Sequence, residues 1–159
     1  MSGTVEVMDR ASVRPPAPEG DERDNVVVIR DVTWALYQTL LDARGEKPRP
    51  RLAYLDGELE IMTTSRRHEI TKKMLARLLE AWVGVRRGSL NAIGGATFKR
   101  KKDEAGLEPD ECYCVGPMKR FPDLSIEVVE TRGGINKLEI YRRLGVREVW
   151  FWIKGKIWI

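Results

Sequence analysis

The sequence contains few of the residues on which several common types of active site depend. It has one histidine and two cysteines among 159 residues, and neither a Gly-x-Ser-x-Gly segment nor a glycine-rich phosphate-binding loop. These absences leave little support for a serine-hydrolase triad, a zincin site or a cysteine-ligated zinc site. Cys112 and Cys114 are also too few for a disulfide framework, and we interpret them as reduced, half-buried small hydrophobic residues.

Long apolar segments are absent as well. No run approaches the roughly 20 residues that span a bilayer, and the N-terminus lacks the charged and apolar segments of a secretory signal. With 42% hydrophobic and 33% charged residues, the composition is typical of a soluble globular protein, which we expect in the cytoplasm and without membrane contact. Residues 1–25 contain three prolines and no apolar period, so they predict a disordered tail before a single domain at 26–159.

Charge is unevenly distributed along the chain, although the net charge is only +4. Residues 62–102 contain 11 lysines and arginines against two acidic residues, whereas residues 103–130 contain eight acidic residues against two basic ones. A basic region beside an acidic one is compatible with polyanion binding next to a metal site. It is also compatible with two solvated faces, and charge alone favours this second interpretation.

Hydrophobic periodicity predicts strands and helices that form an α/β fold with a mixed sheet. We expect strands at about 26–29, 52–54, 58–62, 96–100, 110–115, 124–128, 149–153 and 156–159, and helices at about 34–45, 65–86 and 136–144. Asp56-Gly57 signals a hairpin turn, and a charged loop is expected at 101–108. The buried stripe of the long helix should consist of Ile70, Met74, Leu75, Leu78, Leu79, Trp82 and Val83. Five aromatic residues are interpreted as core rather than as base-stacking residues: Tyr113, Tyr141, Trp150, Trp152 and Trp158.

Acidic residues on two predicted strands are the strongest candidates for chemistry. Asp110 follows Pro109 at the start of one strand, and Glu127 lies in the middle of the next, on the face opposite the aliphatic residues. If these strands are neighbours, both carboxylates can meet and provide the oxygen ligands that Mg²⁺ prefers. The alternative is that both side chains face solvent, although acidic residues are depleted in strands.

Further polar side chains are candidates of lower specificity. Lys137 is predicted in the first turn of the last helix, where the helix dipole disfavours a cation. It could hold an attacking water or neutralise phosphate charge, and a solvated surface lysine is the alternative. Glu58 and Glu60 share one face of the hairpin strand, and Glu60 is better placed to reach a site. His68 is interpreted as a capping or surface residue, with a phosphate or water contact as the alternative.

Three segments resemble a known family of bacterial nucleases: LAYLDGELEIM, GLEPDECYCV and FPDLSIEVVETRGGINKLEIYRRLGVREVWFW. They are similar to the Uma-type family of restriction endonucleases, which belongs to the PD-(D/E)xK nuclease superfamily, and the resemblance runs from about Val28 to the C-terminus. It implies a restriction-endonuclease-like core, in which a mixed sheet is flanked by helices. It also implies DNA as the substrate, Mg²⁺ or Mn²⁺ as the cofactor, and a homodimer.

The resemblance implies roles for individual residues. The superfamily is described as using an Asp on one strand, a Glu or Asp on the next, and a Lys two residues later. The matching motifs imply Asp110 and Glu127 as metal ligands and catalytic residues, with Glu60 as a further acidic residue of the site. The expected lysine position is Val129, and the family resemblance places the lysine in the following helix instead, at Lys137.

A second Pro-Asp pair, Pro122-Asp123, competes with Asp110 for the first of these roles. Asp123 lies four residues before Glu127 on the same strand, which is a separation of about 13 Å in an extended chain. The two carboxylates could hardly share one metal ion, so Asp110 is preferred.

The sequence and the resemblance together predict an endonuclease that requires Mg²⁺ and acts on DNA. Basic residues expected to contact backbone phosphates are Arg66, Arg67, Lys72, Lys73, Lys99, Arg100, Lys101 and Lys102. Because the usual lysine is missing at position 129, the alternative is a catalytically inactive module that keeps the nuclease fold and binds nucleic acid or another partner. A structural protein with charged faces is a third interpretation.

Overall fold

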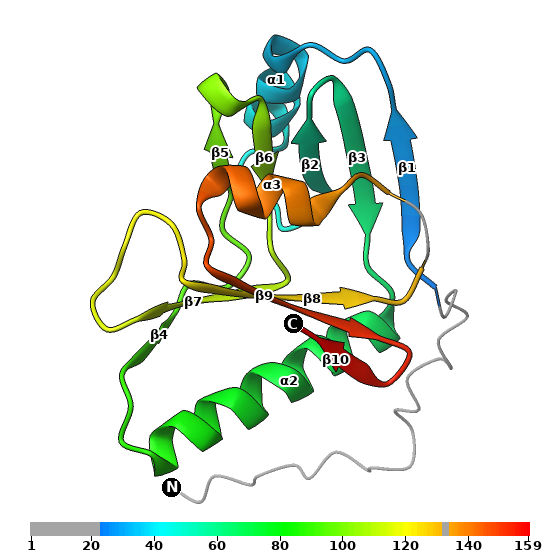
Figure 1. The fold of residues 1–159 in the computed structure, drawn as a ribbon. Helices are drawn as coiled ribbons and strands as arrows, with labels where there is room; N and C mark the ends of the chain where they lie inside the picture. The colour runs from blue at the N-terminus through cyan, green and yellow to red at the C-terminus, as the bar shows by residue number, and fades with distance from the viewer. Residues whose placement is uncertain (1–22, 132–133) are drawn as a thin grey trace, which may run out of the picture.

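The computed structural model describes residues 23–131 and 134–159, which form two five-stranded sheets set across one another (Figure 1). The first sheet is antiparallel throughout, and its order is β1 (Asn25–Ile29), β3 (Glu58–Thr63), β2 (Arg51–Leu55), β6 (Ala105–Leu107) and β5 (Phe98–Arg100). The second has the order β10 (Lys156–Trp158), β9 (Glu148–Ile153), β8 (Leu124–Val129), β7 (Glu111–Val115) and β4 (Leu90–Ala92). Within the described residues only β8 and β9 pair in parallel, and the helix α3 (Lys137–Leu144) connects them. The predicted α/β class of the restriction-endonuclease-like core is confirmed.

Each of the three α-helices in the described part of the chain begins after a side chain that accepts a hydrogen bond from the first helical turn. The caps are Thr33 for α1 (Trp34–Arg44), Ser65 for α2 (Arg66–Val85) and Asn136 for α3 (Lys137–Leu144). A short 3₁₀ turn spans Lys101–Asp103. No helix in the described part of the chain is long and apolar enough to cross a membrane.

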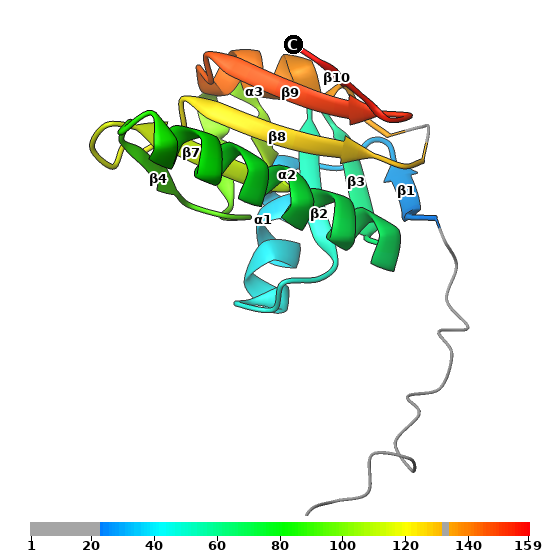
Figure 2. The ribbon, with the colours of Figure 1, turned by 90° about the horizontal axis from the view of Figure 1, so that it is seen from below.

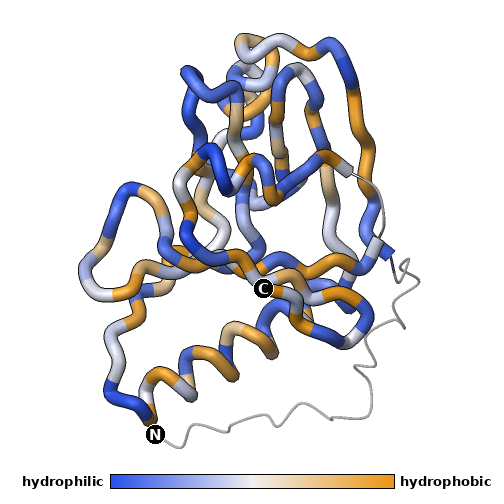
Figure 3. The backbone as a smooth tube through the Cα atoms, in the orientation of Figure 1, coloured by the Kyte–Doolittle hydropathy of each residue, from blue (hydrophilic) through white to orange (hydrophobic). Residues whose placement is uncertain are grey.

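Three hydrophobic clusters hold these elements together. The largest lies between the two sheets and includes the buried face of α3, the second packs α1 on the first sheet, and the third packs α2 on β8. Figure 2 shows α2 running along the outer side of the second sheet. The strands of this sheet and successive turns of α2 include hydrophobic segments in Figure 3. As a result, β8 is covered on both faces, by α2 on one side and by α3 on the other.

The structure corrects several local predictions. The expected charged loop at 101–108 contains the 3₁₀ turn and strand β6, which pairs with β2 and β5 because residues 105–107 are small or aliphatic. Strand β4 was not predicted. Of the seven residues in the expected stripe of α2, only Leu75 and Leu79 are buried, because the helix contacts the sheet through a narrower face. Trp158 is exposed at the sheet edge, so its interpretation as a core residue is wrong.

Other predictions are confirmed or lie outside the described residues. The Asp56-Gly57 hairpin joins β2 to β3, with both residues at the positive φ angles that such a turn requires. Cys112 and Cys114 are free as expected, but both are fully buried rather than half-buried. Residues 1–22 of the expected tail lie outside the described part of the chain. The chain is already packed at Asp24, however, which is buried before β1 begins.

Candidate active site

Glu127 lies at the centre of the candidate site because of the alternation of side chains along β8. Its neighbours Ile126 and Val128 point to the α2 side and join the hydrophobic cluster there, so Glu127 points to the opposite side, toward α3. Its side chain is 1% exposed. The Lys137 Nζ lies 3.0 Å from Glu127 Oε2, and the Tyr141 hydroxyl donates a short hydrogen bond to Oε1. Both oxygens of this buried carboxylate therefore have a donor.

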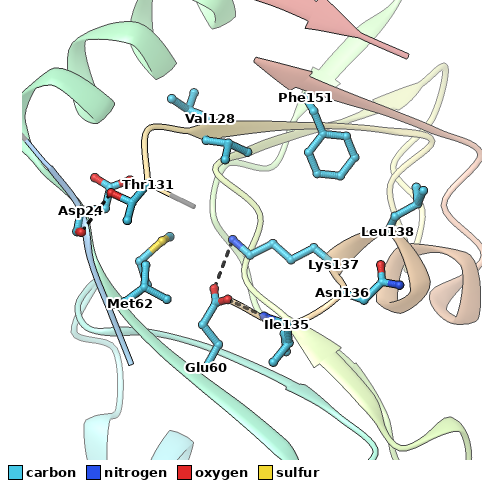
Figure 4. Close-up of a pocket in the computed structure, with 12 residues that line it drawn as sticks. Asp24, Glu60, Met62, Val128, Thr131, Ile135, Asn136, Lys137, Leu138 and Phe151 are labelled. Atoms are coloured by element: carbon cyan, nitrogen blue, oxygen red, sulfur yellow. Dashed lines mark hydrogen bonds and ion pairs between the residues drawn. The ribbon is translucent and has the colours of Figure 1, made fainter. Parts of the chain in front are cut away.

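Lys137 connects the two sheets through an ion pair on each side. It is the first residue of α3, where the Asn136 cap fixes the start of the helix. From there its Nζ reaches Glu127 on β8. It also lies 3.4 Å from Oε1 of Glu60 on β3, and Figure 4 shows this second contact. The other oxygen of Glu60 accepts a hydrogen bond from the backbone N–H of Ile135, at 3.1 Å. A lysine in an unfavourable first-turn position is thus compensated by two carboxylates.

These carboxylates control the charge of Lys137. Burial alone would lower the pKa of the ammonium group, but Glu127 and Glu60 outweigh burial and raise it above its ordinary value. Burial and the negative charge of Glu127 raise the pKa of Tyr141 well above its ordinary value. Lys137 therefore stays a cation and Tyr141 stays a neutral hydrogen-bond donor, so both can donate to Glu127.

A glycine is required where the chain enters this site. Gly134 has a φ angle of +100°, which L side chains rarely adopt, and a Cβ atom there would collide with the carboxylate of Glu60. The close approach of this backbone to Glu60 also allows the adjacent N–H of Ile135 to bind it. Gly134 thus has a direct steric role at the entrance to the site.

Asp110 lies directly before β7, the strand that pairs with β8. Continuing the antiparallel β7–β8 register by one residue places Asp110 opposite Glu127, and Asp110 Oδ2 accepts a hydrogen bond of 2.6 Å from the backbone N–H of Val128. Its Oδ1 is paired with the guanidinium of Arg51 on β2 and lies 2.8 Å from Nε2 of His68 on α2. Asp110 is 1% exposed, so the sheet register brings two buried carboxylates to the same region.

The opposite side of His68 meets another buried carboxylate. Its Nδ1 lies 2.7 Å from Oδ2 of Asp24, and Asp24 Oδ1 accepts a hydrogen bond of 2.7 Å from the backbone N–H of Ser65. Burial alone would raise the pKa of Asp24, but His68 and the Ser65 N–H outweigh it and lower that pKa below its ordinary value. His68 is fully buried. The interpretation of His68 as a capping or surface residue is wrong, because α2 turns the ring inward between two carboxylates.

A cavity of about 260 Å³ lies beside these groups, between the two sheets and the start of α3 (Figure 4). Lys137 and Glu60 provide polar groups to its wall, and Met62, Val129 and Phe151 provide apolar ones. Asp24 and Thr131 lie along the same wall. The cavity therefore gives small molecules or a segment of substrate access to Lys137 and Glu60.

The site has an excess of negative charge. Four carboxylates that are 5% exposed or less face it: Asp24, Glu60, Asp110 and Glu127. The cations in direct contact with them are Lys137 and Arg51, and even a doubly protonated His68 would leave the set negative. Carboxylate oxygens in surplus over cations are the environment in which a hard divalent cation is held, so the residues fit such an ion.

Asp110 and Glu127 are the residues that could hold it. They lie on paired strands at facing positions, and both are carboxylates. Within residues 23–131 and 134–159, no three His, Cys, Asp or Glu side chains are grouped as a ready-made ligand cluster. Waters and substrate oxygens would therefore have to supply the remaining ligands, which is usual for Mg²⁺.

The structure brings together most of the predicted site residues and separates others from them. Glu60, Glu127 and Lys137 are in contact, and Asp110 lies on the adjacent strand. Glu58, the alternative to Glu60, forms an exposed ion pair with Arg30. Asp123, the competitor of Asp110, pairs with Lys119 instead.

Three contributing residues were not found from the sequence. Tyr141 was interpreted only as core, although it lies four residues after Lys137 on the same helix face, a spacing that could have identified it. Arg51 follows two prolines at 48 and 50 and gave no signal. Asp24 fell in the expected tail, where no pattern singled it out.

The predicted phosphate-binding residues fall into two separate groups. Arg66, Arg67, Lys72 and Lys73 lie in the first turns of α2, whereas residues 99–102 lie on β5 and the 3₁₀ turn, at the far end of the other sheet (Figure 1). Lys72 has little exposure because it pairs with Glu69 at 2.7 Å. The sequence predicts that all of these residues contact DNA phosphates, but the fold places them on two separate surfaces.

Comparison with known proteins places the chain in a family. Residues 34–159 match the model of the Uma2 family, whose description is "putative restriction endonuclease". The match covers most of the chain, so the chain belongs to this family. No significant match was found among curated proteins or among solved structures. The family match includes every candidate residue described above except Asp24.

Proposed function

We propose that the protein is a metal-dependent endonuclease that hydrolyses phosphodiester bonds of DNA. The observation that supports this function best is the contact of Lys137 with both Glu127 and Glu60, next to Asp110 on the paired strand. An ammonium group held between buried carboxylates at the rim of a cavity is suited to a reaction on a phosphate anion. Membership of a family described as restriction endonucleases supports the same reaction class.

The residues of the site have different roles in this reaction. Asp110 and Glu127 would hold Mg²⁺ or Mn²⁺, which supplies an activated water and offsets phosphate charge when bound. Lys137 keeps its proton because its pKa is raised, so it acts as a cation and hydrogen-bond donor rather than as a base. It orients the attacking water or neutralises charge on the phosphoryl oxygens. Glu60 and Tyr141 keep Lys137 and Glu127 in place through their contacts with them.

DNA would reach the site along the beginning of α2. Arg66 and Lys73 line the open surface there, and Arg67 is two-thirds exposed beside Glu130. Lys72 is engaged by Glu69, so we expect a smaller contribution from it. Contacts of this kind bind backbone phosphates without sequence preference and weaken with salt. A homodimer would place two such sites on the two strands of a duplex.

The test is cleavage of supercoiled DNA with Mg²⁺, with Mn²⁺ and with a chelator. We expect nicking that requires the metal and that falls by about 100-fold or more in Lys137→Met and Glu127→Gln. Lys156→Met, a change of an exposed lysine on β10, is the matched control and should retain activity. Cleavage that survives both site substitutions, or that persists in chelator, would contradict the proposal.

One observation favours the alternative of an inactive binding module. Every oxygen of Asp110 and Glu127 already has a donor from the protein. A module of this kind would bind DNA in a salt-dependent manner but would neither bind Mn²⁺ nor cleave. Calorimetric titration of the wild type and of Asp110→Asn with Mn²⁺ separates the two, since only the nuclease should show binding that the substitution weakens.

A further inference from the structure

We propose that Asp24 and His68 form a positioning pair that fixes the orientation of Asp110 for metal binding. Asp24 also lines the cavity, but within the described residues neither Asp24 nor His68 forms a hydrogen bond or ion pair with Lys137 or Glu127, and we assign their effect on the site to Asp110. The inference rests on the proposed function, because it assigns a role in holding the carboxylate that would bind the metal ion. It extends the site to the segment that precedes β1.

The geometry forms an unbroken chain of contacts. Asp24 Oδ2 lies 2.7 Å from His68 Nδ1, and His68 Nε2 lies 2.8 Å from Asp110 Oδ1. The imidazole and both carboxylates are between 0% and 5% exposed. Because each ring nitrogen faces a carboxylate oxygen, the ring cannot rotate without losing both contacts, and the position of Oδ1 is fixed by that of the ring.

Asp24 is itself held from two directions. Its other carboxylate oxygen, Oδ1, accepts a hydrogen bond from the backbone N–H of Ser65, the residue that caps α2. Its backbone carbonyl accepts a hydrogen bond from the Thr131 hydroxyl at 3.1 Å. Ser65 Oγ in turn accepts the N–H of His68. The helix cap, the ring and the acid thus form one rigid unit at the start of α2.

This arrangement is costly if it serves stability alone. Burying charged groups carries a desolvation penalty that ion pairing often only balances, and apolar residues of similar size usually stabilise a fold at least as well. The same set of groups is well suited to holding a ligand, because a hydrogen-bonded partner that orients a metal-binding side chain commonly raises metal affinity by 10- to 100-fold. Support of Asp110 as a metal ligand therefore explains why the buried Asp24–His68 pair is present.

Arg51 and the Val128 N–H complete the support of Asp110. Arg51 shares Oδ1 with His68, and the Val128 N–H occupies Oδ2. His68 is the member of this set that has a second, buried acid behind it. Glu127 on the paired strand is held in a comparable way by Lys137 and Tyr141. Each of the two carboxylates thus has its own supporting groups.

The experiment uses the single histidine of the chain as a probe. Protein labelled with ¹⁵N on histidine gives ring resonances that come only from His68 in a tag-free protein, and Mg²⁺ is added stepwise. We expect the Nε2 resonance to move with saturation, because metal binding at Asp110 weakens its hydrogen bond to that nitrogen. Asp110→Asn should abolish this response, and Asp123→Asn, a control on the other Pro-Asp pair, should leave it intact.

Variants of the pair test the effect on metal affinity. Asp24→Asn should weaken Mn²⁺ binding by about 10- to 100-fold in calorimetry. His68→Gln keeps a donor that can reach Asp110 and should bind more tightly than His68→Leu, which keeps none. A parallel urea titration verifies that each variant is folded, so that the His68→Gln rescue is measured among folded proteins.

The outcomes separate this inference from the proposed function. If Mn²⁺ affinity falls in Asp24→Asn and the ring responds to Mg²⁺, the inference is supported even if the protein does not cleave DNA. If the wild type cleaves DNA with Mg²⁺ but Asp24→Asn binds and cleaves equally well, the inference is overturned and the nuclease remains. A wild type that binds no divalent cation overturns both.

Discussion

The two Pro-Asp pairs of the chain begin neighbouring strands, yet their carboxylates lie in very different surroundings. Asp110 is buried and is held by groups from β2, α2 and β8. Asp123 accepts hydrogen bonds from Lys119, four residues earlier, and from the N–H of Val115 at the end of β7. Asp110 is thus held by residues that are distant in sequence, whereas Asp123 is held by residues within eight positions of it.

Strand direction explains this difference. Because β7 and β8 are antiparallel, the start of β7 lies beside the end of β8, where Glu127 is found, and the start of β8 lies at the opposite end of the pair. The same dipeptide therefore places Asp110 across from Glu127 and Asp123 away from it. A Pro-Asp motif marks the beginning of a strand, and the sheet topology decides which of the two can share a ligand with Glu127.

The sharpest test of this comparison is the activity of two matched variants. In Asp110→Asn we expect DNA cleavage to fall by about 100-fold or more, because the substitution removes a metal-binding charge and keeps the size of the side chain. In Asp123→Asn we expect activity close to that of the wild type. The measurement is the initial rate of plasmid nicking in Mg²⁺. Equal losses in the two variants would show that the register argument does not identify the functional acid.

Stability should separate the same two positions by a smaller effect. Asp110→Ala leaves Arg51 and His68 buried without their shared partner, which we expect to lower the free energy of unfolding by about 3–5 kcal/mol. Asp123→Ala breaks an ion pair with a partly exposed lysine and should cost about 1 kcal/mol or less. Urea unfolding followed by tryptophan fluorescence measures both. A small effect at Asp110 would mean that its partners find water or new contacts.

Much of the fold could be predicted from the sequence because its signals are local. The caps at Thr33, Ser65 and Asn136 and the turn at Asp56-Gly57 each depend on residues within a few positions. The short strands β4 and β6 were missed because three residues contain too little periodicity. The division into two sheets depends on long-range pairing, such as that of β2 with β6, which no local pattern encodes.

The candidate site divides in the same way. Glu127, Lys137 and Tyr141 lie within 15 residues on β8 and α3, so motif and helix spacing could identify most of this half. The half around Asp110 was only partly accessible. Its acid was found, but Asp24 lies 86 residues away from it in sequence, and neither a spacing rule nor composition connects them. His68, by contrast, lies two helical turns before the buried Leu75, so the spacing along α2 could have indicated that its ring turns inward.

The smallest expected effect concerns the ion pair of Asp123. Its hydrogen bonds from Lys119 and from the Val115 N–H lower the pKa of Asp123 below the ordinary value of 3.8. A lowered pKa in the folded state means that the ionised carboxylate stabilises the fold above pH 3.8, and that this contribution disappears as the pH falls through the lower value. Lys119→Met should therefore destabilise the protein by less than about 1 kcal/mol at neutral pH.

That difference between Lys119→Met and the wild type should shrink in acid and in high salt, because protonation and screening both remove the charge interaction. Urea midpoints at neutral pH, well below pH 3.8 and in concentrated salt measure it, with Lys156→Met as an exposed-lysine control. A difference that persists in acid would show that Lys119 acts through packing of its aliphatic stem. The Lys119–Asp123 ion pair would then contribute no stability. The contrast between a local ion pair at Asp123 and long-range buried contacts at Asp110 would no longer explain the difference between the two residues.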